Sequence, residues 1–139
     1  MSSNAWALQK AIYAKLTADV PLTALITGVH DAPNGSDELP YVVIGDDTTT
    51  ADGTKTRQHY QHTLTLHIFA AARTAQGGNR GRKDLKKIMA AVEQATDRQP
   101  LTLDSGTVSE FRWEFSESFT EENGDLYHGV MRCRAFTNK

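Results

Sequence analysis

The chain has 139 residues, of which 39% are hydrophobic and 23% are charged, and its net charge is −2. This length suits one domain with its own core, so we expect a single domain over residues 1–139. The near balance of 15 basic and 17 acidic residues disfavours a dedicated DNA-binding protein, which usually carries a basic face. No apolar run approaches the roughly 18 residues that cross a bilayer, and the N-terminus lacks a secretion signal. We therefore expect no membrane contact and a cytoplasmic site of assembly.

Apolar residues recur at helical spacing over residues 4–18, which predicts an amphipathic helix. Ser3 or Asn4 is expected to cap its N-terminus, because either side chain can accept a hydrogen bond from a free backbone N–H. The segment "PLTALITG", residues 21–28, is predicted to form a short helical turn that ends at its glycine. A brief strand is expected over residues 29–32.

The middle of the chain predicts two strands joined by a long connection. A polar loop at residues 33–40 precedes "YVVIG", residues 41–45, whose apolar character predicts a short central strand. Residues 46–58 contain no apolar side chain larger than alanine. We interpret them as a long hairpin loop, or as a loop that becomes ordered on a partner. Strict alternation over residues 59–69 predicts a strand with one face on the core.

A glycine-rich basic segment, residues 70–81, precedes a helix predicted over residues 82–96. The order of strand, glycine loop and helix is the one that cradles phosphates. A P-loop, however, has lysine directly after its last glycine and then a hydroxyl. Here Arg82 follows the last glycine, and Asp84 would repel a phosphate. We interpret the segment as a flexible basic loop, with an anion or nucleotide site at Gly77–Lys83 as the alternative.

Alternation also predicts strands over residues 107–119 and 125–137, joined at Asn123–Gly124. A two-residue loop would send the apolar residues of the two strands to opposite faces of the sheet. We therefore predict a three-residue loop, Glu122–Gly124, with a bulge at the glycine. This loop would set three pairs: Phe115 with Met131, Trp113 with Cys133, and Glu114 with Arg132.

Together these elements predict an α+β fold, a mostly antiparallel β-sheet with two α-helices packed on one face. The other face would carry charged residues of the last two strands, for which cross-strand ion pairs are the simplest interpretation. Glu110 and Glu114 would lie about 13 Å apart along a strand, too far for a glycosidase pair.

No catalytic, cofactor or metal site is predicted. The five histidines lack metal-binding spacing, since His59 and His67 share a strand face but would lie about 26 Å apart. No G-x-S-x-G elbow is present. The single cysteine, Cys133, lies in a predicted strand and is interpreted as a small buried hydrophobe.

The order of segments along the whole chain resembles a family of tailed-phage tail completion proteins, which includes tail terminators and head–tail joining proteins of phages, prophages and gene transfer agents. The resemblance is carried by five stretches: "ALQKAIYAKLTADVPLTALITGVHDA", "LPYVVIGDDTTTADGTKT", "HTLTLHIFA", "GRKDLKKIMAAVEQA" and "FRWEFSESFTEENGDLYHGVMRCRAFT". It implies a non-enzymatic protein without a cofactor, in the virion at the head-proximal end of the tail. Such proteins form a ring, typically hexameric, that stops polymerisation of the tail tube and meets the head connector.

The partners implied by this resemblance are other copies of the chain, the tail tube protein and the head–tail connector or stopper protein. DNA would pass through the ring without specific binding, which the near-neutral charge suits. A neighbouring connector component of similar fold is the alternative. Contacts with subunits or the tube are expected at the two loops and the charged sheet face, namely at Asp46, Asp47, Asp52, Lys55, Arg57, Arg73, Arg80, Arg82, Lys83, Glu110, Arg112, Glu114, Arg132 and Arg134.

Overall fold

The computed structural model describes residues 3–32 and 38–139. The polar loop expected at residues 33–40 therefore lies largely outside the described residues. The elements follow in chain order as α1 (Ala5–Ala18), α2 (Val20–Thr23), β1 (Gly28–His30), β2 (Tyr41–Ala51), β3 (His59–Ala71), α3 (Lys83–Thr96), β4 (Thr107–Thr120) and β5 (Leu126–Asn138).

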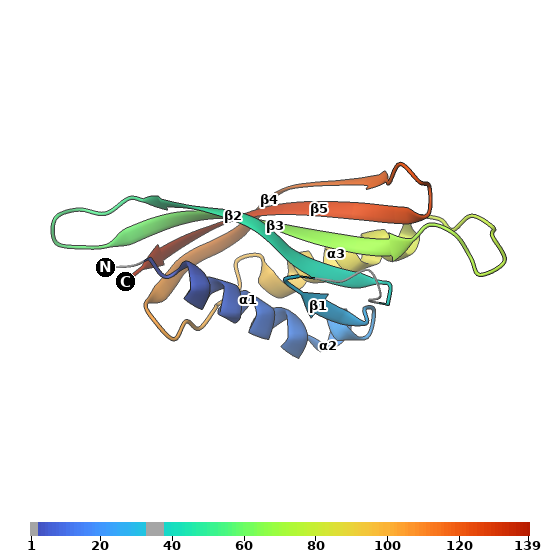
Figure 1. Ribbon diagram of the computed structural model, residues 1–139. Helices are drawn as coiled ribbons and strands as arrows, with labels where there is room; N and C mark the ends of the chain where they lie inside the picture. The colour runs from blue at the N-terminus through green and yellow to red at the C-terminus, as the bar shows by residue number, and fades with distance from the viewer. Residues whose placement is uncertain (1–2, 33–37) are drawn as a thin grey trace.

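The strands form one five-stranded sheet in the order β1-β2-β3-β5-β4. Among the strands of the described residues, only the short β1 runs parallel to its neighbour β2, and every other pair is antiparallel. The helices α1 and α3 lie on the same side of this sheet (Figure 1). The predicted α+β architecture, with two long helices on one face, is confirmed.

The core lies between the two long helices and the inner face of the sheet. Helix α1 contributes Leu8, Ile12 and Leu16, each at most 1% exposed, because these residues recur on one side of the helix. The other core residues come from α2, α3 and the strands, and the largest fully buried ones among them are Leu22, Leu66, Ile68, Leu85, Ile88, Phe111 and Met131. The alternation predicted for residues 59–69 is confirmed, since His62, Leu64, Leu66 and Ile68 are buried in turn.

The residues that begin and end the first two helices differ from the prediction. Asn4 occupies the cap position of α1, but its side chain makes no cap hydrogen bond. It points instead into a buried polar cluster, where its Oδ1 accepts from the Thr137 hydroxyl at 2.7 Å. Gly28 does not end the second helix, as predicted, but begins β1. The cap that forms is at α2, where the Asp19 carboxylate accepts from the backbone N–H of Leu22 at 3.0 Å.

The strand predicted to end at residue 45 continues to Ala51, so the long loop predicted over residues 46–58 is wrong in its first half. A bulge between Ile44 and Asp47 shifts the register by one residue, after which β2 pairs with β3 to its end. Thr48, Thr49 and Thr50 are β-branched and suit a pleated strand even though none is strongly apolar. The loop itself spans only residues 52–58.

The β4–β5 hairpin has its bulge in a different place from the prediction. Near the turn, Thr120 pairs with Tyr127, which is the odd-numbered register that a bulge at Gly124 was expected to prevent. Gly124 does adopt a positive φ of 75°. It lies in a tight turn, in which the Gly124 N–H donates to the carbonyl of Glu121 at 2.9 Å. The register shifts lie instead within the strand, one between Val108 and Glu110 and one in mid-strand between Trp113 and Phe115.

This mid-strand bulge decides which side chains reach the core. Trp113 pairs with Cys133, as predicted, and its face stays on the core. Phe115 pairs with Arg132 rather than Met131, and Glu114 is the inserted residue, so neither of the other two predicted pairs forms. The inserted residue exchanges the faces on which the following odd and even positions of β4 lie. Phe115 therefore points to the outer face and is 46% exposed.

Candidate interaction surfaces

Four charged side chains on β4 and β5 form one network on the outer face of the sheet. Arg112 bonds both Glu110 at 3.3 Å and Glu114 at 3.4 Å, and Arg134 bonds Glu114 at 2.9 Å. The hydrogen bond from Arg134, together with both arginine charges, holds the pKa of Glu114 below its usual range. The predicted cross-strand ion pair thus forms with Arg134 and not with Arg132. The network has no net charge, so its arginines are not free to hold an anion.

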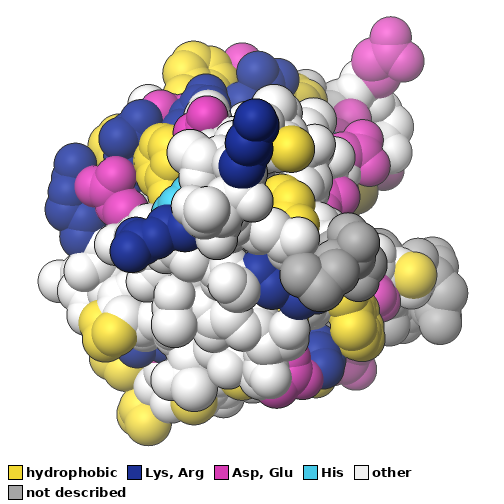
Figure 2. Space-filling model, turned by 90° about the vertical axis from the view of Figure 1, so that its left-hand side faces the viewer, with side chains coloured by type: hydrophobic (Ala, Val, Ile, Leu, Met, Phe, Trp, Pro, Cys, Tyr) yellow, Lys and Arg dark blue, Asp and Glu magenta, His cyan; other side chains and the backbone are white. Residues whose placement is uncertain are grey.

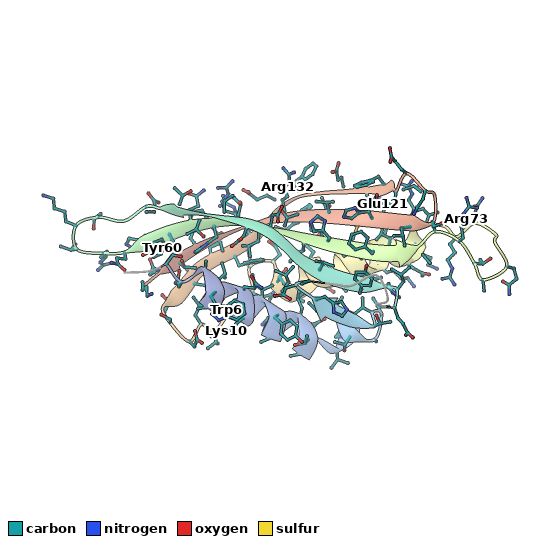
Figure 3. All side chains as sticks on the ribbon, in the orientation of Figure 1. Trp6, Lys10, Tyr60, Arg73, Glu121 and Arg132 are labelled. Atoms are coloured by element: carbon teal, nitrogen blue, oxygen red, sulfur yellow. The ribbon has the colours of Figure 1, made fainter. Side chains whose placement is uncertain are left out.

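Arg132 lies on the same face but makes a different contact. Its guanidinium carbon lies 5.8 Å from the centre of the Phe115 ring, a cation–π arrangement. Figure 3 shows Arg132 and Glu121 on the side of the sheet away from α1, whereas Trp6 and Lys10 project from that helix. The sheet therefore separates two chemically different surfaces.

Two segments extend from opposite ends of the molecule (Figure 1). One is the β2–β3 turn, residues 52–58, which carries the predicted contact residues Asp52, Lys55 and Arg57, all exposed. The remaining two of this group, Asp46 and Asp47, lie on β2 itself. Figure 2 views the molecule from the end that carries this turn and shows acidic and basic side chains interspersed there.

The other extension is the basic arm, residues 72–82, between β3 and α3. It folds back on itself through a bridge between Arg73 and Asn79 and a hydrogen bond from Thr74 N–H to the Gly78 carbonyl at 2.7 Å. Arg73 also forms an ion pair with Asp125 at 3.2 Å. The glycine-rich segment thus forms a small hairpin that is tied at its base to Asp125, just before β5, and its flexibility stays a prediction.

The last part of the basic arm leads into α3 without forming a phosphate cradle. Arg82 donates to the Thr120 hydroxyl at 3.0 Å and lies 5.3 Å over the Tyr127 ring. Arg80 lies 3.9 Å from Asp84, which occupies the first turn of α3, and Lys83 begins the helix on the surface. With a carboxylate in the first turn, this geometry does not favour the alternative of an anion site.

An aromatic–histidine cluster occupies the end of the outer sheet face nearest the basic arm. It consists of five ring side chains from four strands: Tyr41, His67, Phe69, Phe119 and His128. Phe69 and Phe119 flank His128, with ring centres 4.3 and 4.8 Å from it. His67 bonds His128, which in turn bonds the Glu121 carboxylate. Burial lowers the pKa of His67, and the nearby His128 lowers it further.

Sequence reasoning missed this cluster because its members were assigned separately. The alternation of β3 does place His67 and Phe69 on its outer face, but nothing local indicates that His128 lies beside them. Two aromatic side chains of α1, Trp6 and Tyr13, are 63% and 49% exposed. Within residues 3–32 and 38–139, no group of side chains has the geometry of a metal site, and no helix is long and apolar enough to cross a membrane.

Comparison with known proteins gives concordant matches. A family model described as tail completion protein gp17 matches residues 10–138. The tail completion protein gp17 of Bacillus phage SPP1 is 28% identical over 132 residues, which cover 95% of this chain and 92% of that protein. A chain in the virion of a native gene transfer agent particle superposes with a TM-score of 0.85 at 26% identity, with all of both chains covered. The structure of bacteriophage SPP1 gp17 gives a TM-score of 0.61 at 26% identity, covering 94% of this chain and 88% of that one.

Proposed function

This chain belongs to the tail completion protein gp17 family, and we propose that it forms a ring, hexameric in its final state, that terminates the tail tube and joins it to the head. The family consists of structural virion proteins and not of enzymes. The observation that carries the proposal is the likeness, over the whole of both chains, to a subunit of a gene transfer agent particle.

The surface of the subunit supports an assembly role. The β2–β3 turn and the basic arm extend beyond the sheet at opposite ends, where they can reach a neighbouring subunit or the tube (Figure 1). A closed ring needs head-to-tail contacts between two different surfaces of the same chain. An elongated subunit with different chemistry on its two faces meets that requirement.

Passage of DNA through such a ring would not require binding of its phosphates. Nucleic-acid affinity depends largely on lysine and arginine side chains that are free to replace counterions. Arg112 and Arg134 are instead neutralised by Glu110 and Glu114. The partners in this proposal are other copies of the chain, the tube protein and the connector at the head-proximal end of the tail.

Electron microscopy of particles assembled without this chain tests the proposal. We expect tubes of variable and excessive length that are not joined to heads, and rescue when the chain is supplied from a plasmid. Tubes of normal length that remain unjoined would instead assign the chain to a neighbouring connector component. Normal, joined particles in its absence would contradict both roles.

A further inference from the structure

Six large hydrophobic side chains are exposed in the described part of the chain, and two of them lie on different faces at the same end of the molecule. Leu25, which follows α2, is 38% exposed on the helix side. Phe119, near the end of β4, is 37% exposed at the margin of the aromatic–histidine cluster on the outer sheet face.

Leu25 belongs to a hollow of about 330 Å³ between α2, α3 and the end of β3. Its apolar lining includes Leu25, Leu39, Ala70 and Ile88. Basic side chains stand at its margin, because Arg80 and Lys87 also line it. Asp84 lies beside Arg80 at 3.9 Å and offsets one of these charges. The exposed Lys83 lies one helical turn before Lys87, so the hollow is an apolar site with a basic surround, which we call the basic hollow.

Two carboxylates flank Phe119 on the outer face, whereas Arg82 bonds Ser118 and Thr120 from the helix side of the same strand. Glu117 lies two residues before Phe119 on the same face of β4, and Glu121 lies two residues after it. Glu117 is exposed, and Glu121 is held by its bond to His128. The Phe119 ring rests against the His128 ring, with 4.8 Å between centres, so its orientation is set within the free chain. This acidic aromatic projection, Glu117–Glu121, matches the basic hollow in both polarity and charge.

We propose that the Glu117–Glu121 projection of one copy docks into the basic hollow of the next copy, with Phe119 seated against Leu25 and Ile88. This inference rests on the proposed self-association and assigns two surfaces to it. An aromatic anchor in a pocket surrounded by opposite charges is the arrangement that concentrates binding energy and fixes orientation.

The charges also decide between the two possible symmetries. A two-fold contact between identical Phe119 surfaces would bring Glu117 and Glu121 of both copies together, and a contact between two basic hollows would bring their lysines together. Both arrangements place like charges against each other, which is unfavourable. A head-to-tail contact pairs unlike charges and leaves one free surface at each end, as ring closure requires.

Cysteine cross-linking in the full-length chain tests this contact. The native Cys133 should not interfere, because it is buried and its pKa is raised to about 12, chiefly by that burial. The chain carrying both L25C and F119C is expected to form an oligomer ladder on oxidation. Mixing the two single variants should give heterodimers only. The matched control replaces L25C with Q94C, an exposed position on α3 two turns beyond Lys87, and should lose the ladder.

A charge exchange gives a second readout that does not depend on a cysteine. K87E and E117K are each expected to weaken association in sedimentation measurements at low salt, and the double variant K87E/E117K should recover it. K15E, a charge reversal on α1 away from both surfaces, should leave association unchanged.

The outcomes separate this contact from the proposed function. Rings seen by electron microscopy without the L25C–F119C ladder would overturn the contact and leave the ring proposal standing. Homodimers of F119C alone, or cross-links only to another virion protein, would overturn it as well. Absence of rings both in solution and on tails would overturn the contact together with the ring.

Discussion

The imidazole rings of His67 and His128 are hydrogen-bonded to each other across β3 and β5, with 2.7 Å between Nδ1 of His67 and Nε2 of His128. On its other side, His128 Nδ1 lies 2.6 Å from the Glu121 carboxylate. Because a carboxylate only accepts, His128 carries a proton on Nδ1, and its neutral Nε2 accepts from His67. A proton added to His67 would place a positive charge in a half-buried site beside the His128 ring, so acid should disturb this end of the sheet.

Stability is therefore expected to fall with acidification below about pH 6.5. Burial lowers the pKa of His67 from 6.5, and His128 lowers it further, while Asp46 acts in the other direction. Burial also lowers the pKa of His62. Since the unfolded chain then binds more protons than the folded one, the free energy of unfolding decreases as pH falls through this range. Urea titrations at about pH 7.5 and about pH 5.5 measure the difference.

The variant H67N should reduce this pH dependence, because it removes one of the two histidines whose pKa is lowered in the folded chain. Q61N, which shortens a side chain that does not titrate on the same face of β3, is the matched control and should retain the full dependence. Equal pH dependence in the wild type and H67N would show that His67 does not contribute.

Thr137→Val should destabilise the fold by about 1–3 kcal/mol, because it removes one partner from a buried polar cluster. The Thr137 hydroxyl lies 2.8 Å from Nε2 of His62 and donates to Asn4 Oδ1 at 2.7 Å. All three residues are at most 2% exposed. Thr50→Val, at an exposed position of β2, is the control and should change stability by less than about 0.5 kcal/mol. Similar losses in both variants would argue against the cluster.

Gly106→Ala should be strongly destabilising, by more than about 1 kcal/mol, because two independent constraints exclude a side chain there. Gly106 has a φ of 88°, and a Cβ would lie 2.2 Å from the backbone oxygen of Asn138. Gly81→Ala is the control, since a Cβ there meets no atom within 4 Å. Thermal unfolding of the two variants tests the contrast, and a Gly106→Ala chain as stable as the wild type would contradict the close approach of β5 to this glycine.

Amide hydrogen exchange should be fast at the β2–β3 turn and at the tip of the basic arm in the free chain, and slow in assembled tails. The reason is that both segments extend from the body of the molecule and would gain contacts only on assembly (Figure 1). Exchange that is already uniformly slow in the free chain would exclude an ordering role for these segments.

The ion-pair face of the sheet could be predicted from the sequence, but its geometry could not. Charged residues on alternate positions of β4 and β5 indicated an ion-pair face, and the network of Arg112, Glu114 and Arg134 bears this out. The predicted partner of Glu114, Arg132, was wrong, and Arg134 takes its place. The reason is the bulge at Glu114, which an alternating sequence does not indicate. Whether the predicted residues contact other subunits stays a prediction.

The two long helices and the core faces of β3 and β5 were determined by the sequence itself, because 3.6-residue and two-residue periodicities depend only on neighbouring positions. Tertiary structure alone decided the extension of β2 to Ala51, the bulge at Glu114 and the meeting of His67 with His128. Each of these depends on which strands lie side by side and in what register. Strand neighbours and register are decided by contacts between segments far apart in the chain, and local sequence patterns do not predict these contacts.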